Sequence, residues 1–454
     1  MAEGIENIGK KEVVWSYAAT VFTVGAGVIL LPFILYALPA ETVGIWGIFQ
    51  IITGFVLLID FGFRPSFARN ISYVFAGVSK LQTVGVAQVN SETATVDYSL
   101  LKSTIAAMRR FYRLTALVAL VLLGVAGTAY MYYILQKYQG DKTEVMTAWV
   151  LFVVINCYNL YTYYYDALIT GKGYIKRIQQ ITIIGQTLYI GVAVALLYCG
   201  FGLIAIVSAQ LLSVIIRRVL AHTVFYDKAM RSHLKTAVSN RETEHQVMRA
   251  IYPNAVKVGL TQVGGFLVTK SATLIGGAFL PLDIIGSYAT TVQVADVLCR
   301  CGCVVYQSYT PKLAQYRAEN NLRQLKQLYV KSVLSLIAIM VAGSAVFVLW
   351  GDDILQLIRS HTMFLPTGML SALLFISLLE QNHVVAAGFI MADNKIPFFI
   401  PSLLSGAATI LLMWLSMQYL DMGVWGMILA PGIAQLAYQN WKWPSVVIKE
   451  LKNA

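Results

Sequence analysis

Four polar residues share one face of the apolar stretch 284–306 and its end: Gln293, Asp296, Arg300 and Gln307. Residues spaced by three, seven and fourteen positions fall on one narrow stripe of an α-helix, which turns about 100° per residue. An ionisable side chain at membrane depth is costly unless it faces water or a partner, so we expect this stripe to line an aqueous lumen that binds substrate, with Arg300 as the anion ligand. The alternative is an internal ion pair of Asp296 with Arg300 that only holds the helix.

A second polar stripe lies on the stretch 146–168 and consists of Asn156, Asn159, Tyr163 and Asp166. Amides and phenols both donate and accept hydrogen bonds, and aromatic rings pack against the apolar faces of sugars. This combination suits a carbohydrate better than a simple ion, so we expect the two amides and the phenol to bind sugar. Further tyrosines surround the stripe, and for the outlying ones an interfacial aromatic belt is the simpler explanation.

Lys270 and Glu380 are two more ionisable residues inside apolar stretches, 252–275 and 364–390. If they face one another across a cavity, they form a pair that a substrate or a proton can break. Each also has a structural explanation, because a lysine can extend its ammonium group to the membrane surface and a glutamate can join a packing network. We expect Lys270 to bind substrate, and Glu380 and Asp166 to act in coupling or gating.

Asp60 and Arg64 stand at the end of the stretch 43–63 with the spacing of an i, i+4 pair. A proline follows and bends the chain, so Arg64 and Arg69 can meet an anion that arrives from the inner leaflet. Basic residues are also common at cytoplasmic helix ends, which is a general alternative for either arginine. We expect Arg64 to bind substrate and Asp60 to act in coupling or gating.

These residues belong to a membrane protein, because the chain has too few polar residues to cover the surface of a soluble protein. Of its 454 residues, 58% are hydrophobic and only 12% are charged. Apolar stretches of this chain are long enough to cross a hydrocarbon core. We expect twelve transmembrane helices, at 13–37, 43–63, 114–135, 146–168, 178–199, 202–220, 252–275, 284–306, 329–350, 364–390, 397–417 and 423–440.

Basic residues alternate between the two sides of these twelve spans. Connections on one side hold 29 of the 34 lysine and arginine residues, and the other side holds only Lys137, Lys142 and Arg359. Because basic loops are retained in the cytoplasm, the basic side is cytoplasmic and both termini lie there. Lys270 and Arg300 remain inside the membrane region, and we therefore expect both to face a central, water-accessible cavity.

An internal repeat divides the chain into two related halves. The segments 38–46 and 280–288 both begin with Leu-Pro, carry an acidic residue at the fourth position and a glycine at the seventh, and end on an aromatic residue. Each half has an even number of spans, so the halves are parallel repeats. We expect an all-α fold of two parallel six-helix bundles around a central cavity, with bundles at 1–220 and 252–454 and a cytoplasmic linker at 221–251.

Several functions are excluded by what the sequence lacks. The net charge of +12 sits beside helix ends, where anionic lipids rather than nucleic acid are the partner. No phosphate-binding loop of the form GxxxxGK[ST] occurs, and the five cysteines lack C-x-x-C spacing. The long cytoplasmic stretches are too small for a catalytic domain, although residues 100–110 are expected to form a short helix. We expect no enzyme activity, no metal and no cofactor.

The residues around the first repeat segment resemble a known family. Leu-Pro, then Glu41, Gly44 and Trp46, and later Asp60-Phe61-Gly62 and Arg69, are similar to the polysaccharide transporter family, which includes Wzx-type O-antigen unit flippases. Its superfamily also holds multidrug exporters and lipid II flippases. The resemblance implies translocation of an undecaprenyl-diphosphate-linked oligosaccharide across the bacterial cytoplasmic (inner) membrane for surface polysaccharides such as lipopolysaccharide. It also implies a polymerase or glycosyltransferases as partners.

Three other functions remain as alternatives. A cation-coupled multidrug exporter of the same superfamily often has an acidic residue in its first helix, and residues 13–37 have none. A lipid II flippase typically has two helices more than the twelve expected here. A non-transporting scaffold for glycan assembly, which is a different class of protein, has no need for Lys270 or Arg300 within the membrane.

Overall fold

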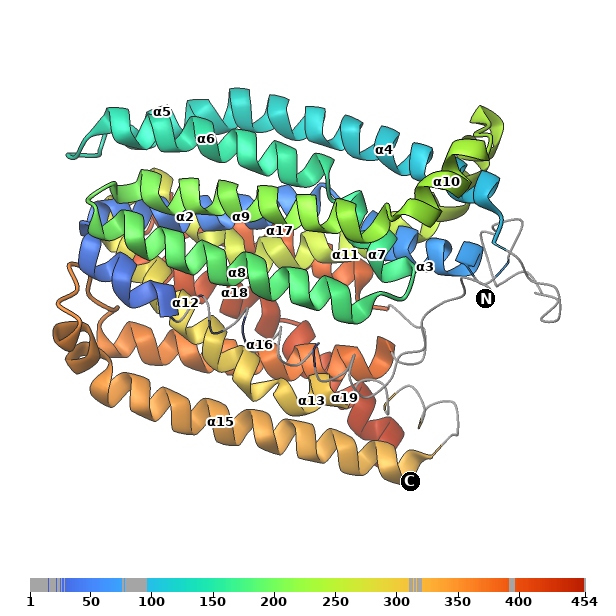
Figure 1. Cartoon of the computed structure of the whole chain (residues 1–454). Coiled ribbons are helices and arrows are strands. Elements are labelled where there is room, and N and C mark those ends of the chain that lie inside the picture. Colours follow the sequence, from blue (N-terminus) through green and yellow to red (C-terminus); the bar gives the residue numbers. More distant parts are fainter. Residues whose placement is uncertain are drawn as a thin grey trace. The chain divides into compact units, whose positions relative to one another are not determined.

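The computed structural model describes residues 29–75, 96–309, 321–391 and 397–452, together with residues 15, 22, 25, 27, 77, 313 and 316. Its regular elements are all helices, which Figure 1 labels along the chain. The first nine are α2 (Ala40–Leu58), α3 (Phe63–Phe75), α4 (Tyr98–Val121), the π-helix η1 (Leu122–Gly127), α5 (Thr128–Leu135), α6 (Lys142–Tyr161), α7 (Tyr164–Gly171), α8 (Ile175–Tyr198) and α9 (Gly202–Phe225). They are followed by α10 (Lys228–Thr236), α11 (Arg241–Phe279), α12 (Leu282–Gly302), α13 (Val304–Ser308), α15 (Leu322–Leu357), α16 (Thr367–Met391), α17 (Phe399–Gln418), α18 (Val424–Leu436) and α19 (Gln439–Lys452).

Eight of these helical segments are long and apolar enough to cross a membrane. Three more expected spans lie in α11, α12 and α18, which are helical but do not belong to the eight. The first expected span, 13–37, falls largely outside the described residues. The chain is therefore an all-α, multi-pass membrane protein, as its sequence predicts.

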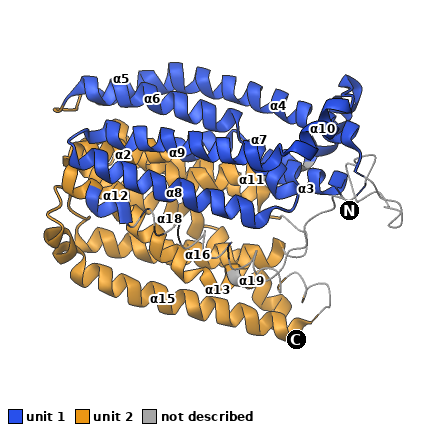
Figure 2. Ribbon diagram, viewed as in Figure 1, with its two compact units in different colours: residues 1–33, 52–136, 141–259 blue, residues 34–51, 137–140, 260–454 orange. Residues whose placement is uncertain are grey.

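Packing divides the chain into two compact units, coloured separately in Figure 2. Unit 1 comprises residues 1–33, 52–136 and 141–259, and unit 2 comprises 34–51, 137–140 and 260–454. Helices α2 and α11 thus each contribute residues to both units. The expected bundles 1–220 and 252–454 describe a repeat symmetry that this partition does not test, so those boundaries stay a prediction.

Helix pairs in unit 1 approach closely at glycines and are tied by side-chain hydrogen bonds. In the α8–α9 hairpin, Ser213 Oγ donates to the carbonyl of Gly185 at 2.7 Å, and the aliphatic part of Arg217 covers that glycine. Where α3 crosses α7, Ser72 Oγ donates to Gly171 O at 2.9 Å, and a Cβ on Gly171 would overlap Ile71. These contacts fix α7 and α9, which carry site residues, against the rest of the unit.

The two repeat segments meet each other within unit 2. A Cβ on Gly44 would overlap the carbonyl oxygen of Leu282, and a Cβ on Gly286 would meet the carbonyl oxygen of Ala40. Gly44 and Gly286 are equivalent positions of the repeat, so each helix start packs against its own counterpart. Reciprocal contact between equivalent residues is what a two-fold relation between parallel repeats produces. The glycines permit the close approach because any side chain there would separate the helices.

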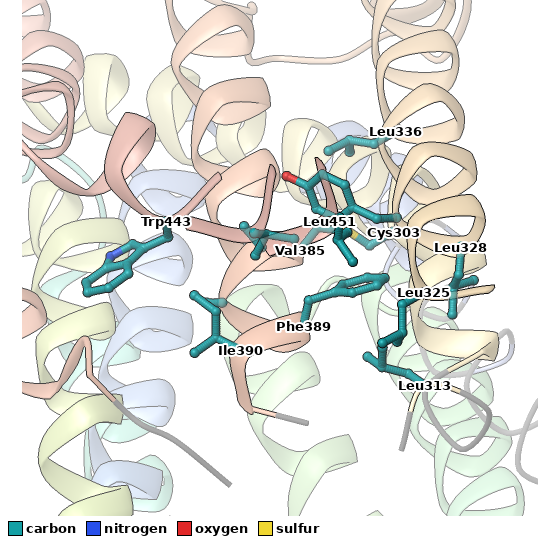
Figure 3. Packing of buried hydrophobic residues seen from close by; sticks show 14 of the residues in the cluster. Cys303, Leu313, Leu325, Leu328, Leu336, Val385, Phe389, Ile390, Trp443 and Leu451 are labelled. Atoms are coloured by element: carbon teal, nitrogen blue, oxygen red, sulfur yellow. The ribbon is translucent and has the colours of Figure 1, made fainter. Parts of the chain in front are cut away.

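One apolar cluster of unit 2 joins α12, α15, α16 and α19. Figure 3 shows Phe389 of α16 lying beside Leu325 and Leu328 of α15, with Trp443 of α19 on the opposite side of α16. Phe389 and Leu325 have no exposed surface. Close packing of this kind holds α16, which carries Glu380, in a fixed position.

Candidate functional site

The break between α2 and α3 positions Asp60 and Arg64. Phe61 and Gly62 both have positive φ angles, of 49° and 70°, which interrupt the helix between α2 and α3. The Arg64 backbone N–H donates to Asp60 Oδ2 at 3.1 Å, so this carboxylate caps α3. Its other oxygen accepts a hydrogen bond from Tyr112 Oη at 2.7 Å. The expected Asp60–Arg64 side-chain ion pair is therefore wrong, because the carboxylate is engaged by the helix start and by Tyr112.

The guanidinium of Arg64 contacts an aromatic ring and does not form the expected ion pair. The guanidinium carbon lies 4.6 Å from the ring centre of Tyr163, which is a cation–π contact. Within the described part of the chain it has no carboxylate partner, and the residue is exposed. Arg64 thus presents a charged group that is oriented by an aromatic ring and lies in the field of Asp166 and Asp60, but forms no direct ion pair with either carboxylate.

The stretch 146–168 is not one continuous helix. Helix α6 ends at Tyr161 and α7 begins at Tyr164, and Thr162 Oγ1 bonds back to the carbonyl of Tyr158 at 2.7 Å. The stripe of Asn156, Asn159, Tyr163 and Asp166 is therefore divided between α6, the turn and α7. Asn156 is buried and donates to its own helix at Phe152 O, 2.9 Å away. The other three residues still converge, but for a reason that the sequence did not reveal.

That reason is Arg218 of α9, which is 3% exposed. Its Nη1 donates to Asp166 Oδ1 at 2.7 Å and its Nη2 donates to Asn159 Oδ1 at 2.6 Å. The guanidinium also lies 5.9 Å from the ring centre of Tyr163. The charge pattern of the sequence places Arg218 only among the 29 basic residues of the cytoplasmic side. Its position one to two turns inside an apolar helix was the signal that could have identified it.

Together these residues form one connected network in unit 1, which we call the arginine network. Two guanidinium groups lie near Tyr163, one bound to a carboxylate and an amide, and the other free of such partners. Tyr112 joins the two ends because its ring contacts Tyr163 at 6.3 Å and its hydroxyl binds Asp60. The arginine network consists of Asp60, Arg64, Tyr112, Asn159, Tyr163, Asp166 and Arg218.

Unit 2 contains a second polar site, around Asp296. Lys270 Nζ forms an ion pair with Asp296 Oδ2, and both side chains are partly exposed, at 29% and 46%. The expected pairing of Lys270 with Glu380 and the alternative pairing of Asp296 with Arg300 are both wrong, because Asp296 takes the lysine. Arg300 is exposed and has no ion-pair partner among the residues the structure describes, and Gln293 is half-buried.

Asp296 also lines a cavity of about 100 Å³ inside unit 2, which we call the α16 pocket. Helices α11, α12, α16 and α18 surround it, and Glu380, Gln381 and Gln435 supply further polar groups. Glu380 Oε1 lies 3.6 Å from His383 Nδ1. Glu380 Oε2 and His383 Nδ1 are buried, and neither has a hydrogen-bond partner in the described protein. The pocket thus combines a small volume with unsatisfied polar atoms. No group of three metal-binding side chains occurs in the portion of the chain that the structure describes.

Comparisons with known proteins agree with this architecture. A family model described as polysaccharide biosynthesis protein matches residues 115–361, which is more than half of the chain. A search of curated proteins gave no match. Among solved structures, the chain is similar to an inward-facing multidrug resistance MATE family transporter of the MOP superfamily, with a TM-score of 0.65, 13% identity, and 96% of each chain covered.

Two further structures have the same fold. The lipid II flippase MurJ in an inward closed conformation aligns with a TM-score of 0.63 and 12% identity over 97% of this chain and 87% of MurJ. A MOP superfamily transporter from Pyrococcus furiosus aligns with a TM-score of 0.51 and 13% identity over 98% and 95% of the two chains. At these identities the likeness establishes the fold alone.

Proposed function

Because this chain belongs to the family of polysaccharide biosynthesis proteins, we propose that it is a flippase for an undecaprenyl-diphosphate-linked oligosaccharide. It moves the glycan from the cytoplasmic to the periplasmic leaflet by alternating access, for the synthesis of a surface polysaccharide such as the O-antigen of lipopolysaccharide. In this proposal the protein is not an enzyme and lies in the bacterial inner membrane with both termini in the cytoplasm. Polymerase or glycosyltransferase partners act before and after it.

The observation that carries the proposal is the exposed guanidinium of Arg64. It is held against Tyr163 at 4.6 Å and has no carboxylate partner in the described chain. A diphosphate is a multivalent anion that accepts charge-assisted hydrogen bonds, for which a planar guanidinium is well suited. Arg300 has the same two properties in unit 2, namely exposure and the lack of an ion-pair partner there. We assign each arginine a role in binding the anionic substrate.

The sugar part of the substrate requires groups that donate, accept and stack. Tyr163 offers a ring and a phenol, and Asn159 offers its amide group beyond the oxygen that Arg218 uses. We assign Tyr163 and Asn159, with Gln293 and Asp296 in unit 2, to the glycan. Asn156 contributes least, because it is buried and bonded within its own helix.

Coupling to an ion or proton gradient is assigned to the α16 pocket. A buried carboxylate oxygen without a hydrogen-bond partner is costly unless another species occupies its lone pairs. Glu380 Oε2 is such an atom, and the imidazole of His383 lies next to this carboxylate. A proton or a small cation bound at Glu380 would supply the missing partner.

A cation-coupled multidrug exporter is the second candidate function. The α16 pocket favours it in one respect, because acidic Asp296 and Glu380 stand among apolar residues there, as a lipophilic cation requires. Its volume of about 100 Å³ opposes it, since pockets for drug-sized ligands measure roughly 300–1,000 Å³. A pocket of this size suits a small ion better than a drug.

Complementation of a deletion strain tests the proposal. We expect the wild-type chain to restore the surface glycan without changing resistance to lipophilic cations. Arg300→Ala should lower surface glycan more than Arg300→Lys at matched protein level, since lysine keeps the charge but loses the planar donor fork. Equal activity in both variants would oppose a phosphate contact at Arg300. Restored drug resistance without restored glycan would instead support the exporter.

A further inference from the structure

We propose that a pocket between α4 and α10 binds the phosphate group of a lipid headgroup at the membrane surface. The pocket, called here the α4–α10 pocket, has a volume of about 410 Å³ and lies wholly within unit 1. It is separate from the arginine network and shares no residue with it. Its walls are the amino-terminal half of α4, the chain after α9, α10 and the start of α11.

Four basic side chains line the pocket: Lys102, Arg109, Arg110 and Arg113. Lys102, Arg109 and Arg113 are spaced by seven and four residues, so they share one face of α4. The lining contains one acidic residue, Glu244, and it is paired with Arg110 at 3.1 Å. The remaining three positive charges have no acidic counterpart in the pocket lining. A phosphate is the anion that such a set of donors recognises.

The guanidinium of Arg109 is oriented by two uncharged tyrosine side chains, which do not neutralise its charge. Its Nη2 donates to Tyr226 Oη at 3.1 Å, and the guanidinium lies 5.5 Å from the ring centre of Tyr164. Burial raises the pKa of Tyr226 to about 12, so this phenol stays neutral at physiological pH. Both partners orient the guanidinium and leave its charge for a ligand.

The wall opposite α4 is fixed by specific contacts. Lys102 Nζ donates to the carbonyl of Ala237 at 2.7 Å, and the backbone N–H of Asn240 donates to Ser103 Oγ at 3.3 Å. The rings of Tyr98 and His233 are stacked with their centres 4.3 Å apart. The cavity is thus built by α10 docking on α4 and is not a gap between loops. Lys102 retains two further N–H donors for a ligand.

The position of the pocket along α4 selects a lipid rather than a free anion. Leu114 and Leu117 follow directly after Arg113 and are 61% and 53% exposed, which suits contact with lipid chains. Arg113 has no ion-pair partner in the ranges that the structure describes. The basic face therefore ends where the apolar membrane-facing surface begins, at the depth of lipid headgroups.

Two lipids carry the required chemistry, a polyprenyl diphosphate and an ordinary anionic phospholipid. The first would make the pocket a loading site for substrate, and this version rests on the proposed function. The second would make it a lipid-dependent support for α10 and does not rest on it. Both are phosphate-bearing headgroups that enter from the leaflet next to α10.

Native mass spectrometry of the full-length protein in neutral detergent tests the proposal, with added undecaprenyl diphosphate or phosphatidylglycerol and with inorganic pyrophosphate as competitor. The test variant is Arg109→Gln with Arg113→Gln. The matched control is Arg323→Gln with Lys449→Gln, which also removes two exposed basic charges but lies in unit 2. We expect the test variant to weaken lipid binding by about tenfold or more, and the control by less than about twofold.

The outcomes separate the two lipid sources and the failure of the idea. Selective binding of undecaprenyl diphosphate, displaced by pyrophosphate, identifies a substrate site, and equal binding of both lipids identifies a general headgroup site. Equal losses in test and control variants, or pyrophosphate binding without lipid binding, would overturn the proposal. Arg113→Gln alone serves as a folding check, because its side chain has no described ion-pair partner to lose. The experiment measures lipid binding and not transport. Its result can therefore be interpreted even if the flippase proposal fails.

Discussion

The arginine network of unit 1 and the α16 pocket of unit 2 use polar residues in opposite ways. In the network, buried Arg218 has a carboxylate and an amide at hydrogen-bond distance, and Asp60 is satisfied by Tyr112 and a helix start. Glu380, which lines the α16 pocket, and His383, which lies next to Glu380 but does not line the pocket, each have a buried polar atom without a hydrogen-bond partner. Arg218 Nε is also buried without a hydrogen-bond partner, but the charge of this guanidinium is paired with the Asp166 carboxylate. A paired buried charge stabilises one arrangement, whereas an unpaired carboxylate oxygen next to a cavity can bind a ligand. We therefore expect Asp166 and Arg218 to stabilise the fold, and we propose that Glu380 binds and releases a small ion.

The largest effect is expected from Arg218→Met. This change leaves the Asp166 carboxylate nearly buried without its partner, and breaking a buried ion pair costs about 3–5 kcal/mol. We expect a marked fall in the unfolding temperature of the purified protein in detergent. Adding Asp166→Asn should recover part of the loss, because no unpaired charge remains. A loss below about 1 kcal/mol would mean that the network is solvated and the comparison is wrong.

Arg64 is expected to behave differently from its neighbour Arg218. Since Arg64 is exposed and lacks a carboxylate partner, Arg64→Ala should leave the unfolding temperature nearly unchanged. It should weaken binding of the lipid-linked diphosphate by about 1.5–3 kcal/mol, the range for a hydrogen bond to a charged group. Arg64→Lys should retain part of the affinity. Binding of undecaprenyl diphosphate to the detergent-solubilised variants measures the effect. Unchanged affinity in Arg64→Ala would remove Arg64 from the substrate site.

Only a small change in stability is expected from Lys270 at the edge of the α16 pocket. Lys270 and Asp296 form an ion pair whose side chains are 29% and 46% exposed, and exposed pairs contribute only about 0.2–1 kcal/mol. Lys270→Met should therefore shift the unfolding temperature far less than Arg218→Met does. Thermal unfolding of both variants side by side makes the comparison. Similar shifts in the two variants would show that Lys270 is structurally as important as Arg218.

The sequence predicts the architecture well because its signals are local. Apolar runs give the helices, and the repeat of Gly44 at Gly286 points to related halves whose equivalent residues do meet. Polar residues inside apolar stretches also identified Tyr163, Asp166 and Lys270 as candidates. The partners of these residues depend on tertiary contacts, which the sequence pattern does not show. No pattern within one segment could reveal that Arg218 is buried between Asn159 and Asp166.

The ion-pair partners predicted from the sequence were wrong because they too depend on tertiary contacts. An i, i+4 spacing suggests that the side chains of Asp60 and Arg64 pair, yet the helix is interrupted at Phe61 and the Asp60 carboxylate accepts from the backbone N–H at the start of α3. Lys270 forms an ion pair with Asp296 and not with Glu380, because helix packing places the Asp296 carboxylate next to the lysine. The break between α6 and α7 falls at Thr162 and Tyr163. Neither residue is a proline or a glycine, so the local sequence does not predict the break.

The most direct test of the account is flipping of a lipid-linked oligosaccharide in proteoliposomes that contain only this protein. The wild-type chain should move the lipid between leaflets, and an imposed ion or proton gradient should increase the rate. Glu380→Gln should keep substrate binding and lose the response to the gradient, whereas Arg64→Ala should lose binding with or without a gradient. Absence of flipping by correctly folded wild-type protein in every gradient would contradict the flippase assignment. Gradient-driven flipping by Glu380→Gln would contradict the role of the α16 pocket.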